Sequence, residues 1–220
     1  MKKTITKLML CIFSITLLVS CGKGESDSGT NNQGEAEKFI TVPDEPKNLP
    51  IATIDIEGFG VIKAELYPHK APNTVNNFID LANSNFYDGV IFHRIISEFM
   101  AQGGDPQGTG AGGPGYSIAG EFPNNGFEVN DIKHKKGILS MARTDAMDTA
   151  GSQFFIMTAD YPSLDGKYAA FGKVIEGMDV VDKLNAVKTA RGDKPVEDVK
   201  INSIKVDTMG EKYDKPVKMK

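Results

Sequence analysis

The sequence has 220 residues, of which 40% are hydrophobic and 25% charged, and its formal net charge is −4 at pH 7. This length fits one globular domain with appendages, and a net negative surface repels nucleic acid and anionic lipid head groups. Beyond the N-terminal stretch, no apolar run reaches the ~18 residues that a membrane-spanning helix needs, so the body of the chain is not a membrane protein.

The first predicted element is a basic and apolar leader. Lys2, Lys3 and Lys7 precede the apolar run LMLCIFSITLLV, and small residues follow before Cys21. This order is typical of a secretory signal peptide, with an uncleaved helical anchor as the alternative. The segment LVSC, residues 18–21, resembles the lipobox of bacterial lipoproteins. That resemblance implies removal of residues 1–20, lipidation of Cys21 and a place in the cell envelope, on the extracytoplasmic side of its membrane.

Removal of residues 1–20 would change the charge and the cysteine content of the chain. It takes away three lysines and no acidic residue, which leaves 22 basic against 29 acidic residues. Cys11 is lost with the leader and Cys21 is modified, so the folded domain keeps no thiol. The domain must therefore be stable without disulfides, although an exported protein is free to use them. A diacylglyceryl group carries two acyl chains, which suffice for stable anchoring.

Composition divides the rest of the chain into three parts. Residues 21–48 are predicted to form a flexible tether, because residues 22–38 contain no apolar side chain larger than alanine and PDEPKNLP follows as a stiffer lead-in. A globular domain is predicted over residues 49–208. The polar and basic tail, residues 209–220, is predicted to fray.

The domain is predicted to be mainly β. Two runs, residues 51–56 and 61–67, flank EGFG as a hairpin. Five further runs are rich in β-formers and bounded by turn residues: VIFHRII, ILSMA, QFFIMT, AAFGKVI and VKINSIKV. Two segments have helical spacing instead. APNTVNNFIDLAN (residues 71–83) places Val75, Phe78, Ile79 and Ala82 on one stripe, and MDVVDKLNAV (residues 178–187) does the same with Met178, Val181 and Leu184. Many strands, two helices and no β-α alternation predict an antiparallel barrel or sandwich.

The glycine-rich segment QGGDPQGTGAGGPG, residues 102–115, contains a GxGxxG pattern at Gly108, Gly110 and Gly113. A dinucleotide-binding loop needs these glycines between a strand and a helix. Here they run into Pro114 and YSIAGEF, which has no helical stripe. A P-loop is also excluded, because no GK[ST] follows at the required spacing. The sequence therefore favours a tight surface loop over a phosphate cradle.

The residues before and after this loop carry a more specific pattern. FHRIISEFMAQGGDPQGTGAGG, residues 92–113, closely resembles the signature of cyclophilins, the peptidyl-prolyl cis-trans isomerases. The resemblance extends in the family's order to GILSMA, AGSQFFI and LDGKYAAFGKVIEGMDVV, and more weakly to APNTVNNFIDLA, so that it covers about residues 50–208. It implies an eight-stranded antiparallel β-barrel capped by two α-helices, an isomerase acting on X-Pro bonds, and no cofactor.

The resemblance also implies which residues act. Twisting the X-Pro bond localises the lone pair on the prolyl nitrogen, and a charged donor aimed at that atom stabilises the twisted state selectively. Arg94 is that donor, Gln102 steadies it, and Phe99 completes the catalytic set. The residues expected to bind substrate are Met100, Ala142, Arg143, Gln153, Phe155, Leu164 and Tyr168. Taken singly, a strand arginine is usually on the surface and apolar residues usually fill the barrel, but the surrounding motif favours the site.

Strand alternation gives a partial geometric check on these assignments. It places Met100 with Gln102, and Gln153 with Phe155, on one side of their strands. By the same rule His93 should point away from Arg94, as a hydrogen-bonded core histidine and not a general base. The three histidines, His69, His93 and His134, are too scattered for a metal motif, and we predict no metal site.

Five residues depart from the family pattern. Arg143 stands where asparagine is frequent, and Ser97 with Glu98 stand where Pro-Gly is common. Ser163 falls where many eukaryotic members have a tryptophan that contacts cyclosporin, and Tyr168 replaces a histidine. The last two bear on cyclosporin sensitivity more than on catalysis.

The sequence thus predicts a lipid-anchored, monomeric prolyl isomerase that acts on proline-containing segments of exported proteins and binds no nucleic acid. The alternative is a cyclophilin-like module that binds such segments without turnover. Retention of Arg94 favours the enzyme, since a pure binder could tolerate its loss. A solute-capturing lipoprotein is disfavoured because it would need a larger, two-lobed chain.

Overall fold

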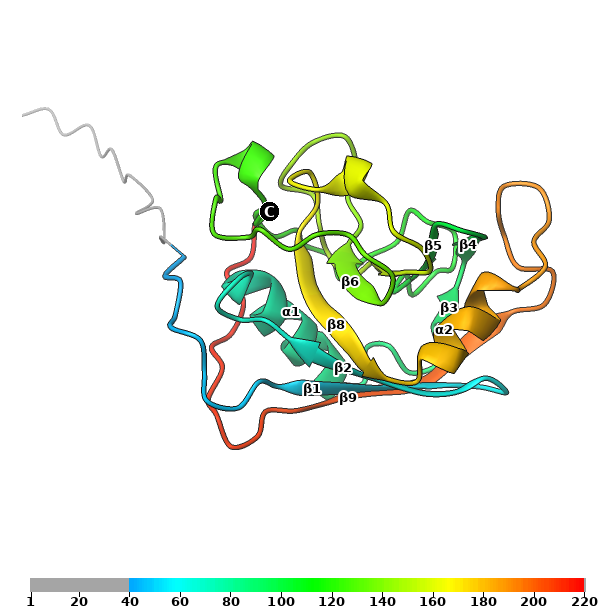
Figure 1. The fold of residues 1–220 in the computed structure, drawn as a ribbon, viewed down its shortest axis with the longest axis horizontal. Coiled ribbons are helices and arrows are strands. Elements are labelled where there is room, and N and C mark those ends of the chain that lie inside the picture. The colour runs from blue at the N-terminus through cyan, green and yellow to red at the C-terminus, as the bar shows by residue number, and fades with distance from the viewer. Residues whose placement is uncertain (1–39, 220) are drawn as a thin grey trace, which may run out of the picture. The chain divides into compact units, whose positions relative to one another are not determined.

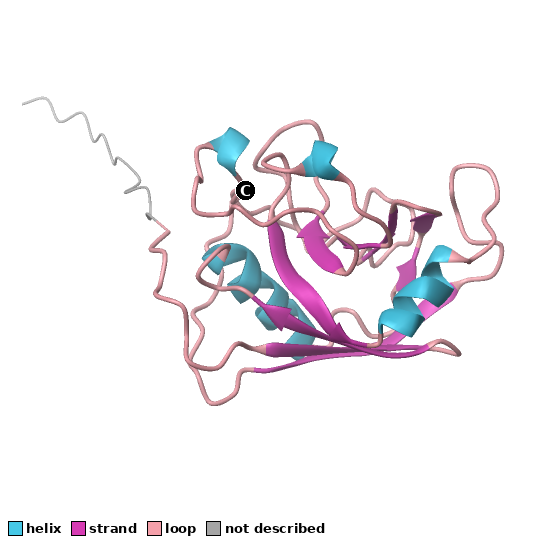
Figure 2. Cartoon of the chain, in the orientation of Figure 1, coloured by secondary structure: helices cyan, strands magenta, loops and turns pink. Residues whose placement is uncertain are grey.

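The computed structural model describes residues 40–219, whose regular elements are mostly strands (Figure 1). The strands are β1 Ile51–Ile56, β2 Gly60–Leu66, β3 Ile91–Phe92, β4 Arg94–Ile96, β5 Met100–Gly103, β6 Ile138–Met141, β7 Phe154–Met157, β8 Ala170–Glu176 and β9 Val199–Asp207. The helices are α1 Pro72–Asn83 and α2 Met178–Asn185. Figure 2 shows two short 3-10 helices, Pro123–Asn125 and Pro162–Leu164, within long loops on one side of the barrel.

The strands form one antiparallel sheet that curls into a nearly closed barrel. Their order is β3-β9-β1-β2-β8-β6-β7-β5-β4. The two ends of this order, β3 and β4, are consecutive in the chain and separated by His93 alone. The family resemblance predicts eight strands, whereas hydrogen-bond pairing gives nine. The predicted run VIFHRII is divided into β3 and β4 because His93 interrupts it. The strand β5 was not among the predicted runs, since it consists of Met, Ala, Gln and Gly.

Helix α1 buries the predicted stripe of Val75, Phe78, Ile79 and Ala82 and packs on β9. Pro72 occupies its first turn, where a backbone N–H would have no acceptor within the helix, so that its absence removes no hydrogen bond. No neighbouring side chain caps this helix. The buried Glu121 takes that role from a distant loop: its carboxylate accepts the N–H groups of Asn73 and Thr74 at 2.9 and 2.7 Å.

Helix α2 lies on the other side of β8 from α1 (Figure 1). It buries Val180, Val181 and Leu184 and contacts β2, β4 and β5. Met178, which was expected on the same stripe, is partly buried against the core.

Strands β5, β6 and β7 are covered on both faces. Their inward side chains join the barrel core, where Phe154 packs with Phe78, Tyr87 and Phe92 at ring-centroid distances of 5.5, 5.6 and 6.1 Å. Their outward side chains form a second cluster of buried residues with Ala170 of β8, namely Met100, Ile138, Phe155, Met157 and Ala170. The alternation of strands thus separates a core from an outer apolar patch.

The C-terminal tail is ordered up to residue 219, so the expectation that it frays is wrong. Val217 donates its N–H to the Asn73 side chain at 2.7 Å, and the Asn73 amide donates back to the Val217 carbonyl at 3.0 Å. Ser117 and Met219 form a β-bridge, and Lys218 Nζ lies 4.1 Å from the centre of the Tyr116 ring. The composition of the tail is polar, but α1 and the loop at residues 116–118 provide its partners.

Within residues 40–219, no helix combines the length and the apolar character needed to cross a membrane. The predicted signal peptide, Cys21 and most of the predicted tether lie outside the described residues.

Candidate functional site

The glycine-rich loop closes around the carboxylate of Asp105. Four backbone N–H groups of the loop donate to it, those of Gln107, Thr109, Gly110 and Gly112, at 2.7, 2.9, 2.6 and 3.1 Å. Burial raises the pKa of the Asp105 carboxyl, but the four donors lower it by more, so that it lies below its usual value. A Cβ at Gly112 would lie 2.0 Å from Asp105 Oδ1. A phosphate-binding loop would use such backbone N–H groups to bind its ligand. Here they are already bonded to the Asp105 carboxylate, so they are not available to a phosphate.

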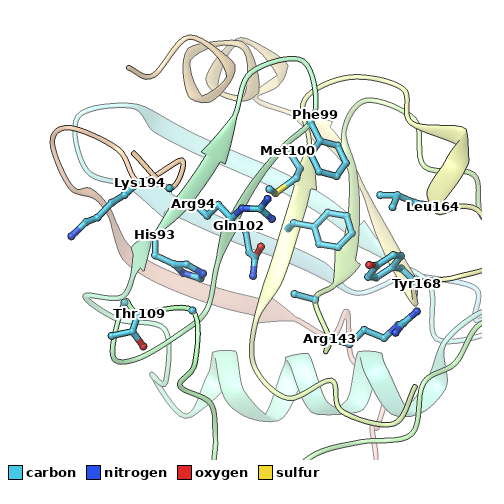
Figure 3. Close-up of a pocket in the computed structure, with 15 residues that line it drawn as sticks. His93, Arg94, Phe99, Met100, Gln102, Thr109, Arg143, Leu164, Tyr168 and Lys194 are labelled. Atoms are coloured by element: carbon cyan, nitrogen blue, oxygen red, sulfur yellow. The ribbon is translucent and has the colours of Figure 1, made fainter. Parts of the chain in front are cut away.

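A cavity of about 530 Å³ lies beside this loop, over the outer apolar cluster (Figure 3). Nine of the ten residues predicted to act in catalysis or substrate binding line it: Arg94, Phe99, Met100, Gln102, Ala142, Arg143, Phe155, Leu164 and Tyr168. Further lining residues are His93, Gly108, Thr109, Gly110, Gly192 and Lys194. The tenth predicted residue, Gln153, lines an adjoining cavity. Residues far apart in the sequence are therefore brought to one site.

Arg94 is the first residue of β4, and its guanidinium projects into the cavity beside Met100 and Gln102 (Figure 3). Its Nε donates to Asp193 Oδ2 at 3.3 Å. Gln102 lies opposite Arg94 in the β4–β5 register, but its side-chain amide donates to Gln153 Oε1 at 2.9 Å. Among the described residues, the Arg94 side chain thus bonds to Asp193, while Gln102, which was expected to steady Arg94, bonds to Gln153.

Gln153 connects the strands to the glycine loop. Its amide nitrogen donates to the carbonyls of Gly110 and Gly112 at 3.0 and 2.9 Å, while its oxygen accepts from Gln102. Gln153 precedes β7 by one residue, yet its side chain is on the cavity side, as strand alternation with Phe155 predicts. This chain of amides fixes one wall of the site.

The floor and far wall of the cavity are apolar. Phe99 and Met100 lie near Arg94, and Leu164 lies farther from it across the cavity (Figure 3). Phe155 lines the same cavity. The Phe155 ring meets the Tyr168 ring edge-on, with centroids 5.9 Å apart and an interplanar angle of 81°. A charged donor thus stands beside an apolar depression.

Arg143 makes several contacts at the rim of the cavity. Its guanidinium lies 4.7 Å from the centre of the Tyr168 ring and 5.1 Å from that of Phe122. Its Nε and Nη2 donate to the Lys167 carbonyl at 3.1 and 2.9 Å. The side chain therefore lies along the rim, where it joins the loop after β6 to the loop before β8.

Comparison with known proteins agrees with this geometry. The family described as cyclophilin type peptidyl-prolyl cis-trans isomerase/CLD matches residues 51–206. The chain belongs to this family. It is 46% identical over 163 residues to the peptidyl-prolyl cis-trans isomerase CYP18-2 of Arabidopsis thaliana, covering 73% of this chain and 96% of that one. It is 44% identical over 153 residues to the isomerase ppi1 of Schizosaccharomyces pombe, covering 69% and 96%.

A solved cyclophilin-type isomerase of Cryptosporidium parvum, determined in the presence of the dipeptide Ala-Pro, has a TM-score of 0.65 and 35% identity to the chain. The match covers 71% of this chain and 98% of that one. The mainly β fold and the isomerase activity expected from the sequence are thereby confirmed. This chain is a cyclophilin-type isomerase.

One departure from the cyclophilin pattern is visible in the backbone. Glu98, where the family commonly has glycine, has a φ of +57°, in the left-handed region that favours glycine. The end of α2 holds it there: Glu98 N donates to Asn185 Oδ1 at 2.7 Å, and Asn185 Nδ2 donates to Glu98 Oε1 at 3.0 Å. A reciprocal contact offsets the strain that the substitution introduces.

Sequence reasoning missed a buried hydrogen-bonded group behind the cavity floor. His134 Nε2 lies 3.0 Å from Ser140 Oγ, and its Nδ1 lies 3.2 Å from Asp165 Oδ1. The imidazole stacks on Phe155. Burial lowers the pKa of His134, although Asp165 acts in the opposite direction. Ser140 is fully buried, so this Ser-His-Asp arrangement supports the floor and offers no accessible nucleophile.

His93 differs from its expected role. It is buried, but it lies between β3 and β4, outside the regular alternation, and it borders the same cavity as Arg94. Neither ring nitrogen has a hydrogen-bond partner in the described part of the chain, so the expectation of a hydrogen-bonded core histidine is wrong. Burial lowers the pKa of His93, which favours the neutral imidazole. Among residues 40–219, no group of three or more His, Cys, Asp or Glu residues is arranged to hold a metal ion.

Proposed function

We propose that this isomerase acts outside the cytoplasm, on proline-containing segments of exported proteins, while a lipid on Cys21 holds it at a membrane of the cell envelope. The order of basic leader, apolar run and LVSC supports the anchor. The polar residues that follow Cys21 would let the domain reach clients away from the membrane surface. Rotation about X-Pro bonds is a slow step of folding, and exported chains fold after translocation.

We assign the chemistry to Arg94 and the apolar depression beside it, and this juxtaposition carries the proposal. Rotation about an X-Pro bond breaks amide resonance, against a barrier of about 18–20 kcal/mol. No bond forms or breaks, so the site needs only to bind the twisted amide more tightly than either planar form. A permanently charged guanidinium that donates to the pyramidal prolyl nitrogen meets this requirement.

The surrounding residues have complementary parts in this proposal. Phe99, Met100, Phe155 and Leu164 would hold the prolyl ring while the preceding residue turns, because their side chains form the apolar part of the cavity. Ala142 and Arg143 would border the path of the peptide, with Tyr168 at the rim. The Cryptosporidium parvum isomerase studied with Ala-Pro supports a proline-containing ligand for this cavity.

We further propose that the protein acts as a monomer. Sedimentation of the lipid-free domain tests this point: a single species of about 20 kDa is expected, and a stable dimer would contradict it.

Turnover separates the enzyme from a binding module. We expect the domain to accelerate cis-trans exchange of a short X-Pro peptide, measured by NMR exchange spectroscopy at catalytic amounts of protein. Chemical-shift changes in the cavity residues without faster exchange would favour the non-catalytic module instead.

Mass spectrometry of the N-terminal peptide tests the anchor. The native protein should begin at Cys21 and carry a diacylglyceryl group. Cys11→Ala is the matched control, because it changes a cysteine of the leader and should leave this mass unchanged. A native protein that begins at Met1, with Cys21 as a free thiol, would instead show an uncleaved helical anchor.

A further inference from the structure

We propose that Asp193 is a positioning residue for the reaction and sets the orientation of the Arg94 guanidinium. The contact joins Arg94 Nε to Asp193 Oδ2 at 3.3 Å. Arg94 makes no other side-chain hydrogen bond to residues 40–219, so both Nη atoms remain available to a substrate. A guanidinium is planar, so an acceptor at Nε fixes the direction in which the Nη atoms point.

The backbone of Asp193 is itself fixed to the strand that carries Arg94. Strand β4 lies at the end of the sheet order, and the N–H of Ile95 donates to the Asp193 carbonyl at 2.8 Å. One residue thus provides an acceptor to Ile95 through its backbone and to the adjacent Arg94 through its side chain. This double contact limits the positions that the carboxylate can take.

The loop around Asp193 is a tight turn. Ala190 N donates to the Lys194 carbonyl at 2.7 Å, and Asp193 N donates to the Ala190 carbonyl at 3.2 Å. Asp193 has a φ of +61°, in the left-handed region that Gly, Asn and Asp adopt most readily. Residue 193 therefore suits a side chain that is small, polar and able to accept a hydrogen bond.

The exposure of the pair predicts where its effect will appear. The side chains of Arg94 and Asp193 are 43% and 45% exposed. Exposed ion pairs contribute little to folding stability, because water screens them and ordering two side chains costs entropy. Catalysis is more sensitive, since a donor displaced by a fraction of an ångström loses much of its transition-state stabilisation. We therefore expect loss of the carboxylate to lower turnover while the domain stays folded.

Two substitutions suit the backbone at this position. Asp193→Gly removes the side chain and accepts the positive φ. Asp193→Asn keeps an acceptor oxygen and removes the charge. We expect kcat for an X-Pro peptide to fall about 3- to 10-fold in Asp193→Gly and by less in Asp193→Asn, with the Kd for the peptide unchanged, since the pair acts on the twisted state. Asp88→Asn is the matched control, because this exposed carboxylate forms an ion pair with Lys205 at 3.9 Å and neither residue lines the cavity.

Two further measurements distinguish positioning from a structural role. In an Arg94→Ala background, Asp193→Gly should have no additional effect on kcat, because Asp193 acts through the arginine. The Nε–Hε signal of Arg94 should be protected from solvent exchange in the wild type and lose that protection in Asp193→Gly. The Ile95 amide should remain protected in both.

Unchanged kcat in Asp193→Gly would overturn the proposal. So would an equal loss of kcat with and without Arg94. The Arg94 Hε signal gives an answer that does not depend on turnover: if Asp193→Gly leaves it unchanged, Asp193 does not position the guanidinium. An inactive wild type would contradict the isomerase assignment, whereas the Hε signal would still decide whether the two side chains pair.

Discussion

The two faces of strands β5 to β7 have different surroundings, although both are apolar and both are buried. The inner face carries Phe154, enclosed by three other aromatic rings of the barrel core. The outer face carries its neighbour Phe155, which borders the cavity beside Arg94. Adjacent residues of the same type are thus divided between the barrel core and the cavity by the two-residue period of a strand.

This difference explains why burial alone does not identify the site. Phe155 is only 6% exposed and Met100 only 2%, so either could be taken for core. What distinguishes the outer face is the polar boundary around it, where Arg94, Gln102 and Arg143 meet the apolar floor. An apolar surface with a few fixed polar groups at its edge is typical of ligand sites.

Substitution of Phe154 and of Phe155 should have different effects on stability and activity, and this difference should be the largest between the two faces. We expect Phe154→Ala to lower the free energy of unfolding by about 3–5 kcal/mol, because it leaves a cavity among aromatic rings. Phe155→Ala should cost less, about 1–2 kcal/mol, since water can enter the space from the cavity. Its kcat/KM should nevertheless fall about 10- to 100-fold, because the prolyl ring loses its floor.

Urea unfolding and peptide exchange, measured on the same two variants, check this pair of predictions. Equal losses of stability in both variants would show that the outer face is part of the core. Full activity in a folded Phe155→Ala variant would remove Phe155 from the site.

A change of pH should affect the outer face through His134. Burial lowers the pKa of His134 below its usual value of 6.5, and it also lowers those of His69 and His93. The unfolded chain therefore binds more protons than the folded one as the pH falls through about 6.5, so acid favours unfolding. We expect the Tm to fall between pH 7.5 and 5.5.

The histidine of the floor can be separated from the others by His134→Asn. This variant should be less stable at pH 7.5 but show a smaller decrease of Tm between the two pH values, since one proton-binding group is gone. A Tm that rises on acidification in the wild type would contradict the direction of these pKa shifts.

The smallest expected change in stability is for substitution of Glu98, which precedes the cavity residue Phe99. Glycine adopts the φ of +57° found here without strain. We expect Glu98→Gly to raise the free energy of unfolding by about 0.5–1 kcal/mol, after allowance for the lost contact of its carboxylate with Asn185. Glu98→Ala is the control, because it loses the same carboxylate but keeps a Cβ and should be destabilised. A lower stability for the glycine variant would show that the contact with Asn185 outweighs the strain.

The parts of the fold that follow from local pattern could be predicted from the sequence. The stripe of Val75, Phe78, Ile79 and Ala82 depends only on helical spacing, and all four are buried in α1. Strand alternation correctly placed Met100 and Gln102 on the cavity side. The set of lining residues came from the resemblance to cyclophilins, because no local pattern distinguishes Phe155 from Phe154.

The parts that depend on contacts between distant residues could not be predicted. Asp193 meets Arg94 across 99 positions, and Glu121 caps α1 from another loop. Neither residue has a neighbouring pattern that marks it. The tail was expected to fray because its composition is polar, yet Asn73 gives it backbone-like hydrogen bonds. Side-chain partners of this kind are set by the tertiary fold and not by local propensity.

Substitution of Arg94 tests the central claim most directly, namely that one cation stabilises the twisted amide. In Arg94→Ala, kcat/KM for an X-Pro peptide should fall about 10²- to 10³-fold, the range found when a fixed donor to a developing charge is removed. The Kd for the peptide and the Tm should stay close to those of the wild type, because the donor acts only in the twisted state. Exchange NMR on one sample of the folded variant measures both kcat/KM and the Kd, and thermal unfolding gives the Tm. Undiminished exchange in Arg94→Ala would contradict the account.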